Sequence, residues 1–323
     1  MTTEIQRKVI EILRILSESD EPVGARIIAD GLHKRGYDIQ ERAVRYHLRM
    51  LDRHGFTEKH GYAGRMITEQ GLNELEDALV EDRLGFVITK IEELIYMTTF
   101  DPLKKEGNVV VNVSIIDKND FDKTIKIIGE VTEKGYTVSP LIKIIEEDER
   151  IGDLKINNGK IGIATMCSIT LDGMLLKGGV PLEIEYGGTL QISEGVAANF
   201  IDLIGYRGTS IDPIEAFISR GMTSVNKALR TGTGVVLANY RSIPSVAVDK
   251  ANEIIDAARR SKIDGVIGVF EDSTLGIPIE FERAGIPIFV GVNGLAAAEE
   301  MGIETETRAI SSLISYKNMR DVY

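Results

Sequence analysis

The chain has 323 residues, of which 43% are hydrophobic and 27% charged, a composition typical of two or three folded domains. Its single cysteine, Cys167, excludes a disulfide framework within the chain. The N-terminus lacks a secretory apolar segment, and no apolar run is long enough to span a bilayer, so we expect a cytoplasmic protein with no membrane partner.

The net charge of −12 is distributed unevenly along the chain. Residues 1–70 contain 12 Lys and Arg against 11 Asp and Glu, a balance of +1, whereas the remainder holds 26 against 39, a balance of −13. DNA affinity depends on the local field at the phosphates, and not on the total charge of the chain. The negative net charge of the whole chain therefore does not exclude a nucleic-acid-binding segment at the N-terminus.

The first 70 residues show the element order of a winged helix-turn-helix domain. Hydrophobic spacing and turn residues predict, in chain order, helices over 3–17, 24–34 and 40–54, two short strands within 56–67, and a helix that begins at Thr68. In the second helix we expect Ile27, Ile28 and Leu32 to face the core. This order predicts a DNA-binding domain at 1–70, whose third helix enters a major groove.

The third predicted helix has a polar face opposite its apolar stripe. This face carries Arg42, Arg45, Tyr46 and Arg49, with Gln40 at the entering end of the helix. Arginine can donate two parallel hydrogen bonds to guanine and glutamine can pair with adenine, each contact contributing about 1–3 kcal/mol of base discrimination. We expect Gln40, Arg42 and Arg45 to read bases, because the N-terminal end of the helix enters the groove most deeply. Tyr46 and Arg49 are expected to contact phosphate.

The hairpin after this helix supplies further cationic side chains. We expect Lys59, His60 and Arg65 to contact a phosphate or the minor groove. Two alternatives stay open: the arginine-rich face is an ordinary solvated surface, or the winged helix binds a protein in place of DNA. The four histidines of this segment lack the spacing of zinc ligands, so we expect no metal site.

Residues 71–105 are predicted to form a broken helical linker. Two leucine- and isoleucine-rich stripes are offset from each other near Gly85. The linker either packs on its own domain or forms a dimer contact that sets the spacing of DNA half-sites.

From residue 106 to 323 the pattern changes to strands that alternate with helices. Apolar runs predict strands over 109–116, 136–145, 160–165, 234–239, 265–270 and 287–290, and helices over 121–134 and 248–262. Such alternation predicts an α/β regulatory domain with a mixed sheet. We therefore expect a multi-domain protein in which this larger domain follows the winged helix.

Several classes of enzyme are disfavoured in the large domain. No histidine follows His60, which excludes a Ser-His-Asp or Cys-His pair there. The chain has no phosphate-binding GxxxxGK[ST] loop, and the segment 231–234 (TGTG) lacks the last glycine of a dinucleotide fingerprint. We therefore expect no enzyme and no cofactor, and we interpret Cys167 as a buried structural thiol.

Four Gly-, Ser- and Thr-rich turns of the large domain combine backbone N–H donors, hydroxyls and arginines. These groups suit a small dianionic acid, because arginine binds a carboxylate with two parallel hydrogen bonds. The candidate ligand-binding residues are Ser168, Thr170, Arg207, Thr209, Ser210, Arg230, Thr231 and Arg241. Each turn taken alone is also explained as a tight loop, and the sequence leaves open whether they converge in space.

Distinctive segments resemble the NrpR family of nitrogen regulatory proteins of methanogenic archaea. They are 42–48 (RAVRYHL), 167–181 (CSITLDGMLLKGGVP), 186–188 (YGG), 208–213 (GTSIDP) and 291–300 (GVNGLAAAEE). The resemblance covers nearly the whole chain and implies a repressor of nitrogen-assimilation genes. It also implies that the protein binds palindromic operator DNA as an oligomer and is released by 2-oxoglutarate. Longer members carry two tandem regulatory domains, whereas this sequence supports one.

Our working hypothesis is a homodimer whose recognition helices enter successive major grooves and lose their register when a dicarboxylate binds. A second hypothesis is a co-regulator that binds a partner repressor, or another protein with an NrpR regulatory domain, in place of DNA. A third is an enzyme fused to a DNA-binding domain, which would need a catalytic constellation that the motifs above do not provide.

Overall fold

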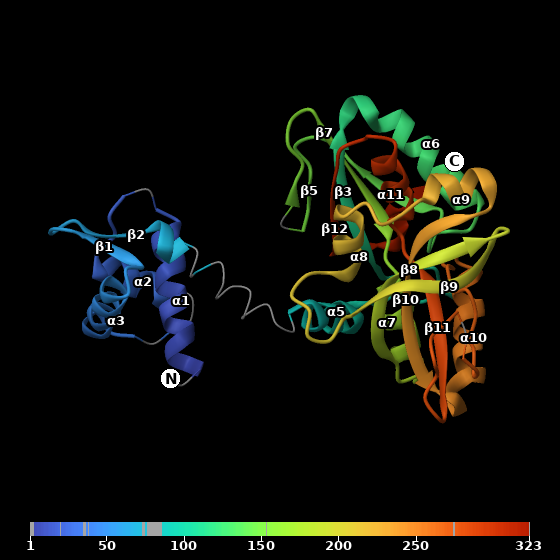
Figure 1. Ribbon diagram of the computed structural model, residues 1–323, viewed down its shortest axis with the longest axis horizontal. Coiled ribbons are helices and arrows are strands. Elements are labelled where there is room, and N and C mark those ends of the chain that lie inside the picture. The colour runs from blue at the N-terminus through green and yellow to red at the C-terminus, as the bar shows by residue number, and fades with distance from the viewer. Residues whose placement is uncertain are drawn as a thin grey trace. The chain divides into compact units, whose positions relative to one another are not determined.

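The computed structural model describes residues 3–19, 21–34, 37, 39–72, 75, 86–152, 154–273 and 275–322 (Figure 1). Contacts divide the chain into two compact units, Met1–Leu84 and Gly85–Tyr323. This division places helix α5 (Phe86–Met97), which we expected within a linker over 71–105, in the second unit. The reason is that its apolar side chains, including Ile91 and Leu94, pack in the core of that unit.

The first unit has the elements of a winged helix. In chain order they are α1 (Thr3–Ser17), α2 (Ala25–Lys34), α3 (Glu41–Arg53), β1 (Thr57–His60) and β2 (Gly64–Ile67). A cluster of buried aliphatic residues from all three helices forms the core. The expected winged helix-turn-helix is confirmed, and the predicted element bounds differ by a residue or two at most.

The hairpin is attached to the segment between α1 and α2. The Val23 N–H donates to the Arg65 carbonyl at 2.9 Å, and the Arg65 N–H donates to the Val23 carbonyl at 3.1 Å. Gly64 permits this approach, because its φ is +135° and a Cβ there would lie 2.3 Å from the Val23 carbonyl oxygen. Val23 therefore fixes the wing against the helical part of the unit.

Helix α2 corrects one expectation about the core. Ile28, Ala29 and Leu32 are buried, whereas Ile27 is 63% exposed. The helical period places Ile28 and Leu32 on one stripe, and Ala29 takes the neighbouring core position. The prediction that Ile27 faces inward was therefore wrong.

The second unit is an α/β domain. After α5, its elements in chain order are β3 (Asn108–Asp117), η1 (Lys118–Asp120), α6 (Phe121–Glu133), β4 (Leu141–Ile145), β5 (Arg150–Ile151), β6 (Leu154–Lys155), β7 (Lys160–Met166), α7 (Ile169–Lys177), β8 (Glu183–Ser193), β9 (Val196–Gly205), α8 (Pro213–Ser219), α9 (Val225–Thr231), β10 (Gly234–Pro244), η2 (Ser245–Ala247), α10 (Val248–Arg259), β11 (Arg283–Phe289), α11 (Asn293–Glu300), β12 (Thr305–Ser315), η3 (Tyr316–Asn318) and β13 (Arg320–Asp321). Within the described ranges, no helix combines the length and the apolar character needed to cross a bilayer.

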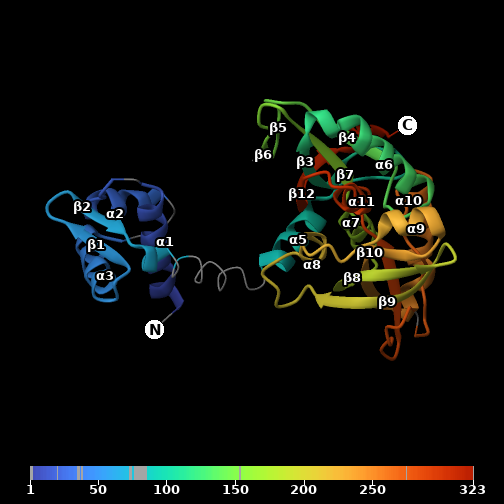
Figure 2. The same ribbon diagram turned by 45° about the horizontal axis from the view of Figure 1, so that its top comes forward.

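Two larger sheets organise this domain (Figure 2). Their strand orders are β12-β3-β7-β4-β13 and β11-β10-β8-β9. The two-domain fold class is confirmed, but all strand pairs in the described ranges are antiparallel, where we had expected a mixed sheet. The reason is the position of β7. Strands β3 and β4, which α6 connects, run in the same direction, but β7 lies between them and runs opposite to both, so each pair is antiparallel.

Two apolar layers cover both faces of the β3-β7-β4 sheet. On one face, Val111 and Val113 of β3 pack with side chains of α7 and α10. On the other face, Ile161 and Ile163 of β7 pack with side chains of α6, α9 and α11, and α6 and α11 lie side by side in both views (Figures 1 and 2). The alternation of side chains along each strand therefore fills two cores at once.

Two predicted strands differ from the structure. Strand β4 begins at Leu141 and not at Tyr136, because Pro140 has no N–H to donate and Ser139 donates instead to the Lys262 carbonyl. The segment 265–270 makes isolated bridges to β11 without forming a continuous strand. Its first residue is a glycine with φ of +91°, a backbone conformation that interrupts a regular ladder.

Candidate DNA-binding surface and effector site

Helix α3 presents the polar face that the sequence predicted. Its apolar side is buried against α1 and α2, and the opposite side is exposed. The exposed residues are Gln40, Arg42, Arg45, Tyr46 and Arg49. Gln40 is the N-cap residue, yet its side chain makes no capping hydrogen bond, so its amide is available to a partner. The geometry thus brings Arg42, Arg45, Tyr46 and Arg49 to one exposed face of α3, and Gln40 is exposed at its N-terminal end.

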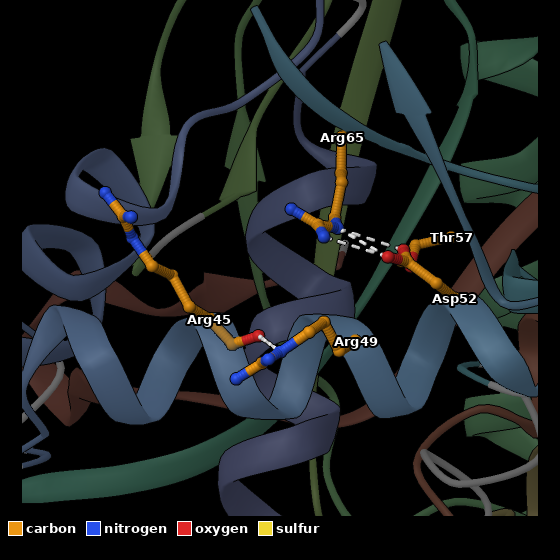
Figure 3. Close-up of polar contacts among 5 residues, drawn as sticks. All are labelled: Arg45, Arg49, Asp52, Thr57 and Arg65. Atoms are coloured by element: carbon orange, nitrogen blue, oxygen red, sulfur yellow. Dashed lines mark hydrogen bonds and ion pairs between the residues drawn. The ribbon is translucent and has the colours of Figure 1, made fainter. Parts of the chain in front are cut away.

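Within the described residues, Arg45 and Arg49 of this surface make weak local contacts. Arg45 forms an ion pair with Glu41 one turn earlier, with an Nη2–Oε1 distance of 2.5 Å. The Arg49 Nε donates to the Arg45 carbonyl at 3.3 Å (Figure 3). An exposed ion pair of this spacing contributes about 0.3–0.5 kcal/mol, less than one good contact to a base edge. Arg45 can therefore leave Glu41 for a stronger partner.

Arg65, which we expected to contact DNA, is engaged within the domain (Figure 3). Its Nε and Nη2 donate to Asp52 of α3 at 2.9–3.0 Å, and the Thr57 hydroxyl donates to the same carboxylate at 2.6 Å. Burial by itself would raise the pKa of Asp52, but the bonds from Arg65 and Thr57 outweigh it and hold the pKa below its ordinary value. Arg65 therefore orients the wing on the recognition helix.

The tip of the wing is the most exposed part of the hairpin. Lys59 and His60, which we predicted to contact DNA, are exposed at the end of β1. Tyr62 follows them and its side chain is fully exposed. The sequence reasoning missed Tyr62, although an aromatic residue between Gly61 and Gly64 is a signal of a projecting hairpin tip. These three side chains are therefore accessible to a partner.

A buried ion pair lies at the centre of the regulatory domain. Arg241 of β10 and Asp172 of α7 are both fully buried. The Arg241 Nε donates to both carboxylate oxygens at 3.1 Å, and Nη2 lies 3.1 Å from Oδ2 without a hydrogen-bond geometry. Burial raises the pKa of Asp172, and Arg241 opposes this shift. Such a pair is costly to desolvate, which makes it a candidate functional feature.

A short chain of hydrogen bonds lies beside this pair. The Tyr206 hydroxyl donates to Asn239 Oδ1 at 2.9 Å, and Asn239 Nδ2 donates to the Ser168 hydroxyl at 3.0 Å. The Arg241 guanidinium also lies over the Tyr206 ring, 5.5 Å from its centroid. Burial raises the pKa of Tyr206 well above its ordinary value, so its hydroxyl stays protonated. The network joins α7, β10 and the segment after β9.

Asp212 adds a second carboxyl group to this centre. Its Oδ1 accepts from the backbone N–H groups of Ile214 and Glu215 and caps helix α8. Its Oδ2 is buried and has no hydrogen-bond partner among the described residues. Burial, with the nearby charge of Glu215, raises the pKa of Asp212 to about 7. A large share of this side chain is therefore protonated at neutral pH and can donate a hydrogen bond.

These polar groups surround a small cavity. Its lining is Asn112, Cys167, Ser168, Ile169, Tyr206, Asp212, Ile214, Asn239, Arg241, Val290, Gly291 and Val292. The cavity volume is about 20 Å³, which corresponds to roughly one water molecule. Burial raises the pKa of the Cys167 thiol to about 12, so this thiol is neutral and unreactive, as the buried structural interpretation requires. We call these lining residues, together with Asp172, the buried polar cluster.

Two of the predicted ligand residues belong to this cluster. Ser168 and Arg241 line the cavity, and we had selected both from glycine- and hydroxyl-rich turns. Thr170 lies one turn along α7, but its hydroxyl is used by the backbone of Val110 in β3, at 3.0 Å from the N–H and 3.2 Å from the carbonyl. Thr170 therefore holds α7 against β3 and is not free for a ligand.

The other predicted ligand residues do not line this cavity. Arg207, Thr209 and Ser210 lie in the segment after β9, and Arg207 is exposed. Arg230 and Thr231 end helix α9, where each donates to a carbonyl one turn earlier. The sequence left open whether the four turns converge, and they do not converge on this cavity, because the turns follow elements in different parts of the domain. The sequence also missed Asp172, Asn239 and Tyr206, whose apolar surroundings give no sign of a polar site; Asp212 had one signal, the Asp-Pro pair that starts α8.

Metal binding has no support in the described part of the chain. Among the described ranges, no group of three or more His, Cys, Asp or Glu side chains is arranged to hold a metal ion. The buried polar cluster instead combines one guanidinium, which is paired with Asp172, with the carboxyl group of Asp212 and several neutral donors.

Comparison with known proteins identifies the family. The model of the NrpR regulatory domains NRD1 and 2 matches residues 84–321, and that of a ribonuclease R winged-helix domain matches residues 10–75. The chain is 50% identical to the global nitrogen regulator NrpRI of Methanosarcina mazei over the full length of both. The chain belongs to the NrpR family. It is therefore a transcriptional regulator, and the resemblance seen in the sequence is confirmed.

Other members of the family are longer or more distant. The global nitrogen regulator NrpR of Methanococcus maripaludis is 37% identical over 96% of this chain, which spans 54% of that protein. A solved nitrogen repressor-like protein of Methanococcus jannaschii aligns with 73% of this chain and 98% of its own, at a TM-score of 0.62 and 29% identity. The names of these NrpR relatives are those of regulators, consistent with the expectation that the chain is not an enzyme.

Proposed function

We propose that the chain represses nitrogen-assimilation genes by binding palindromic operator DNA as a homodimer, and that 2-oxoglutarate releases it. The observation that carries the proposal is the exposed polar face of α3, which combines three arginines with an amide on one accessible helix surface. The family membership supplies the regulatory context.

The DNA-binding step uses the two ends of this face differently. Gln40, Arg42 and Arg45 lie in the first half of the recognition surface and are proposed to contact base edges in the major groove. Arg49, Tyr46 and the wing tip are proposed to contact phosphates and to fix the orientation of the helix. In a symmetric dimer the two helices would read half-sites about one helical turn apart.

The effector step is proposed to occur at the buried polar cluster. A cavity of about 20 Å³ cannot hold 2-oxoglutarate, so the cluster has to expand when the ligand enters. One ligand carboxylate would compete with Asp172 for Arg241, and the protonated Asp212 would donate to it. Because the ligand fits only an expanded form, its binding free energy favours that form, which is the condition for a switch.

A path from this cluster to the start of the domain supports the proposed coupling. Cys167, Ile169 and Tyr206 of the cavity wall pack in the same apolar layer as the buried face of α5. Helix α5 is the first described element of the second unit, directly after the boundary between the units. Expansion of the cavity would therefore displace the helix that leads back toward the DNA-binding domain.

The test is fluorescence anisotropy of the full chain with a palindromic promoter fragment at fixed salt. We expect saturable binding that 2-oxoglutarate weakens, and a smaller effect of glutarate, which lacks the keto oxygen. A double variant, Asp172→Asn with Arg241→Gln, removes both buried charges together and should bind DNA but resist release. Arg230→Ala, outside the cavity, is the matched control. Normal release of the double variant would reject this effector site.

The length of two relatives favours a second candidate, a co-regulator. The chain spans about half the length of the Methanococcus maripaludis and Methanocaldococcus jannaschii regulators. A chain of half length could act together with a second protein that supplies the remaining half. This candidate predicts no anisotropy change with the purified chain alone, and a change once the partner is added.

A further inference from the structure

A second pocket lies on the other face of strand β10. Consecutive side chains of a strand point to opposite faces of its sheet. Asn239 and Arg241 line the buried polar cluster, whereas Tyr240 and Ser242 line a separate pocket of about 300 Å³. The remaining wall consists of Glu185, Tyr186, Leu203, Arg283 and the segment 276–280. We call this space the tyrosine pocket.

The floor of the tyrosine pocket is aromatic. The Tyr186 and Tyr240 rings are paired across β8 and β10, with centroids 6.3 Å apart and planes tilted by 35°. The Phe200 ring meets Tyr240 edge-on, also at 6.3 Å. The electron-rich faces of such rings attract cations.

Tyr240 presents a hydroxyl to this pocket. The residue is 4% exposed, and its hydroxyl makes no hydrogen bond with any described residue. The hydroxyl lies close to Gly285, where a Cβ would be 2.2 Å away, so the glycine makes room for it. Among the described residues, the hydroxyl is not one of the buried polar atoms that lack a partner, so it remains accessible and can bond to a ligand in the pocket. Burial, with the charge of Glu185, raises the pKa of Tyr240 to about 12, which keeps it neutral.

The charges around the pocket favour a cation. Glu185 and Glu280 line it, and neither carboxylate forms an ion pair within the described residues. Arg283 is already occupied, because its guanidinium donates to the Ser242 hydroxyl at 2.6 and 3.0 Å and lies 3.3 Å from Glu183. An anion would meet two unpaired carboxylates and an arginine that Ser242 and Glu183 already engage.

We propose that the tyrosine pocket binds a small organic cation, with an ammonium group held between Glu185 and Glu280 and an apolar body packed on Tyr186 and Tyr240. The Tyr240 hydroxyl is the neutral hydrogen-bonding group of the site. This site is separate from the proposed effector site in both position and charge preference, since only the backbone of β10 is shared. Failure of this proposal would therefore not contradict the function proposed above, and failure of that function would not contradict this site.

The test is isothermal titration calorimetry of the full chain with benzylammonium chloride, using benzyl alcohol as the uncharged probe. We expect saturable binding of the cation that weakens with added salt, and at least tenfold weaker binding of the alcohol. Glu185→Gln and Glu280→Gln should each weaken the cation about three- to fivefold, and Tyr240→Phe by a similar factor. Glu282→Gln, which is exposed and outside the lining, should change affinity less than twofold.

The thermal unfolding midpoint of each variant shows whether a loss of affinity comes from a loss of folding. Tyr240→Phe removes only the hydroxyl and keeps the shape of the ring. Equal affinity for benzylammonium and benzyl alcohol would overturn the proposal, because it would indicate an apolar pocket without charge selection. Unchanged affinity in both glutamine variants, or no binding of the cation at all, would overturn it as well.

Discussion

Replacing Asp212 by Asn gives a sharp test of the buried polar cluster. Asn keeps the N-cap of α8, because its side-chain oxygen can still accept from Ile214 and Glu215. It removes the proton equilibrium whose pKa is raised from 3.8 to about 7 by burial. A pKa that is raised on folding stabilises the protein below pH 4, and this stability is lost as the pH rises toward the folded-state pKa.

The size of the effect follows from the shift. A displacement of about three pKa units corresponds to roughly 4 kcal/mol over the whole window, and to about 2–3 kcal/mol between pH 5 and pH 8. The wild type should lose this much stability relative to Asp212→Asn as the pH rises. Comparing the two proteins at each pH cancels the contribution of the other titrating groups.

Urea unfolding at pH 5 and pH 8 measures this difference. Asp117→Asn, at the more exposed N-cap of η1, controls for the effect of an Asp-to-Asn change on cap chemistry. If the gap between Asp212→Asn and the wild type is the same at both pH values, the carboxyl is not titrating in a desolvated site. The proposed hydrogen bond from Asp212 to a ligand carboxylate would then have no basis.

Three further predictions concern the winged helix. Arg65→Ala removes the ion-pair partner of Asp52 and should lower the free energy of unfolding of the first unit by about 1–3 kcal/mol, measured by urea unfolding. A free energy of unfolding equal to wild type would show that the ion pair does not hold the wing. Arg45→Ala should weaken specific operator binding by at least about tenfold in anisotropy, as loss of one bidentate contact implies, while non-specific binding changes little. Gly64→Ala should cost several kcal/mol, because a Cβ cannot fit against Val23; a thermal midpoint within 2 °C of wild type, on the order of a few tenths of a kcal/mol, would contradict this.

Local patterns decided the features that depend on a single element. The polar face of α3 could be predicted because a helix of period 3.6 separates its apolar and charged residues whatever it packs against. Gly55 follows the C-cap of this helix and has a positive φ of 77°, as a glycine at this position commonly does. The family motifs are also local, because each is a short run of neighbouring residues, and they are sufficient to indicate the regulator class.

Only the tertiary structure decided which polar groups meet. The sequence gives no sign that Arg65 reaches back to Asp52, or that Arg241 and Asp172 pair across 69 residues. The first contact depends on how the hairpin packs on α3, and the second on the strand order β11-β10-β8-β9 and on where α7 crosses its sheet. The burial that raises the pKa of Asp212 has the same origin, since it comes from elements distant in the sequence that exclude water from one carboxyl group.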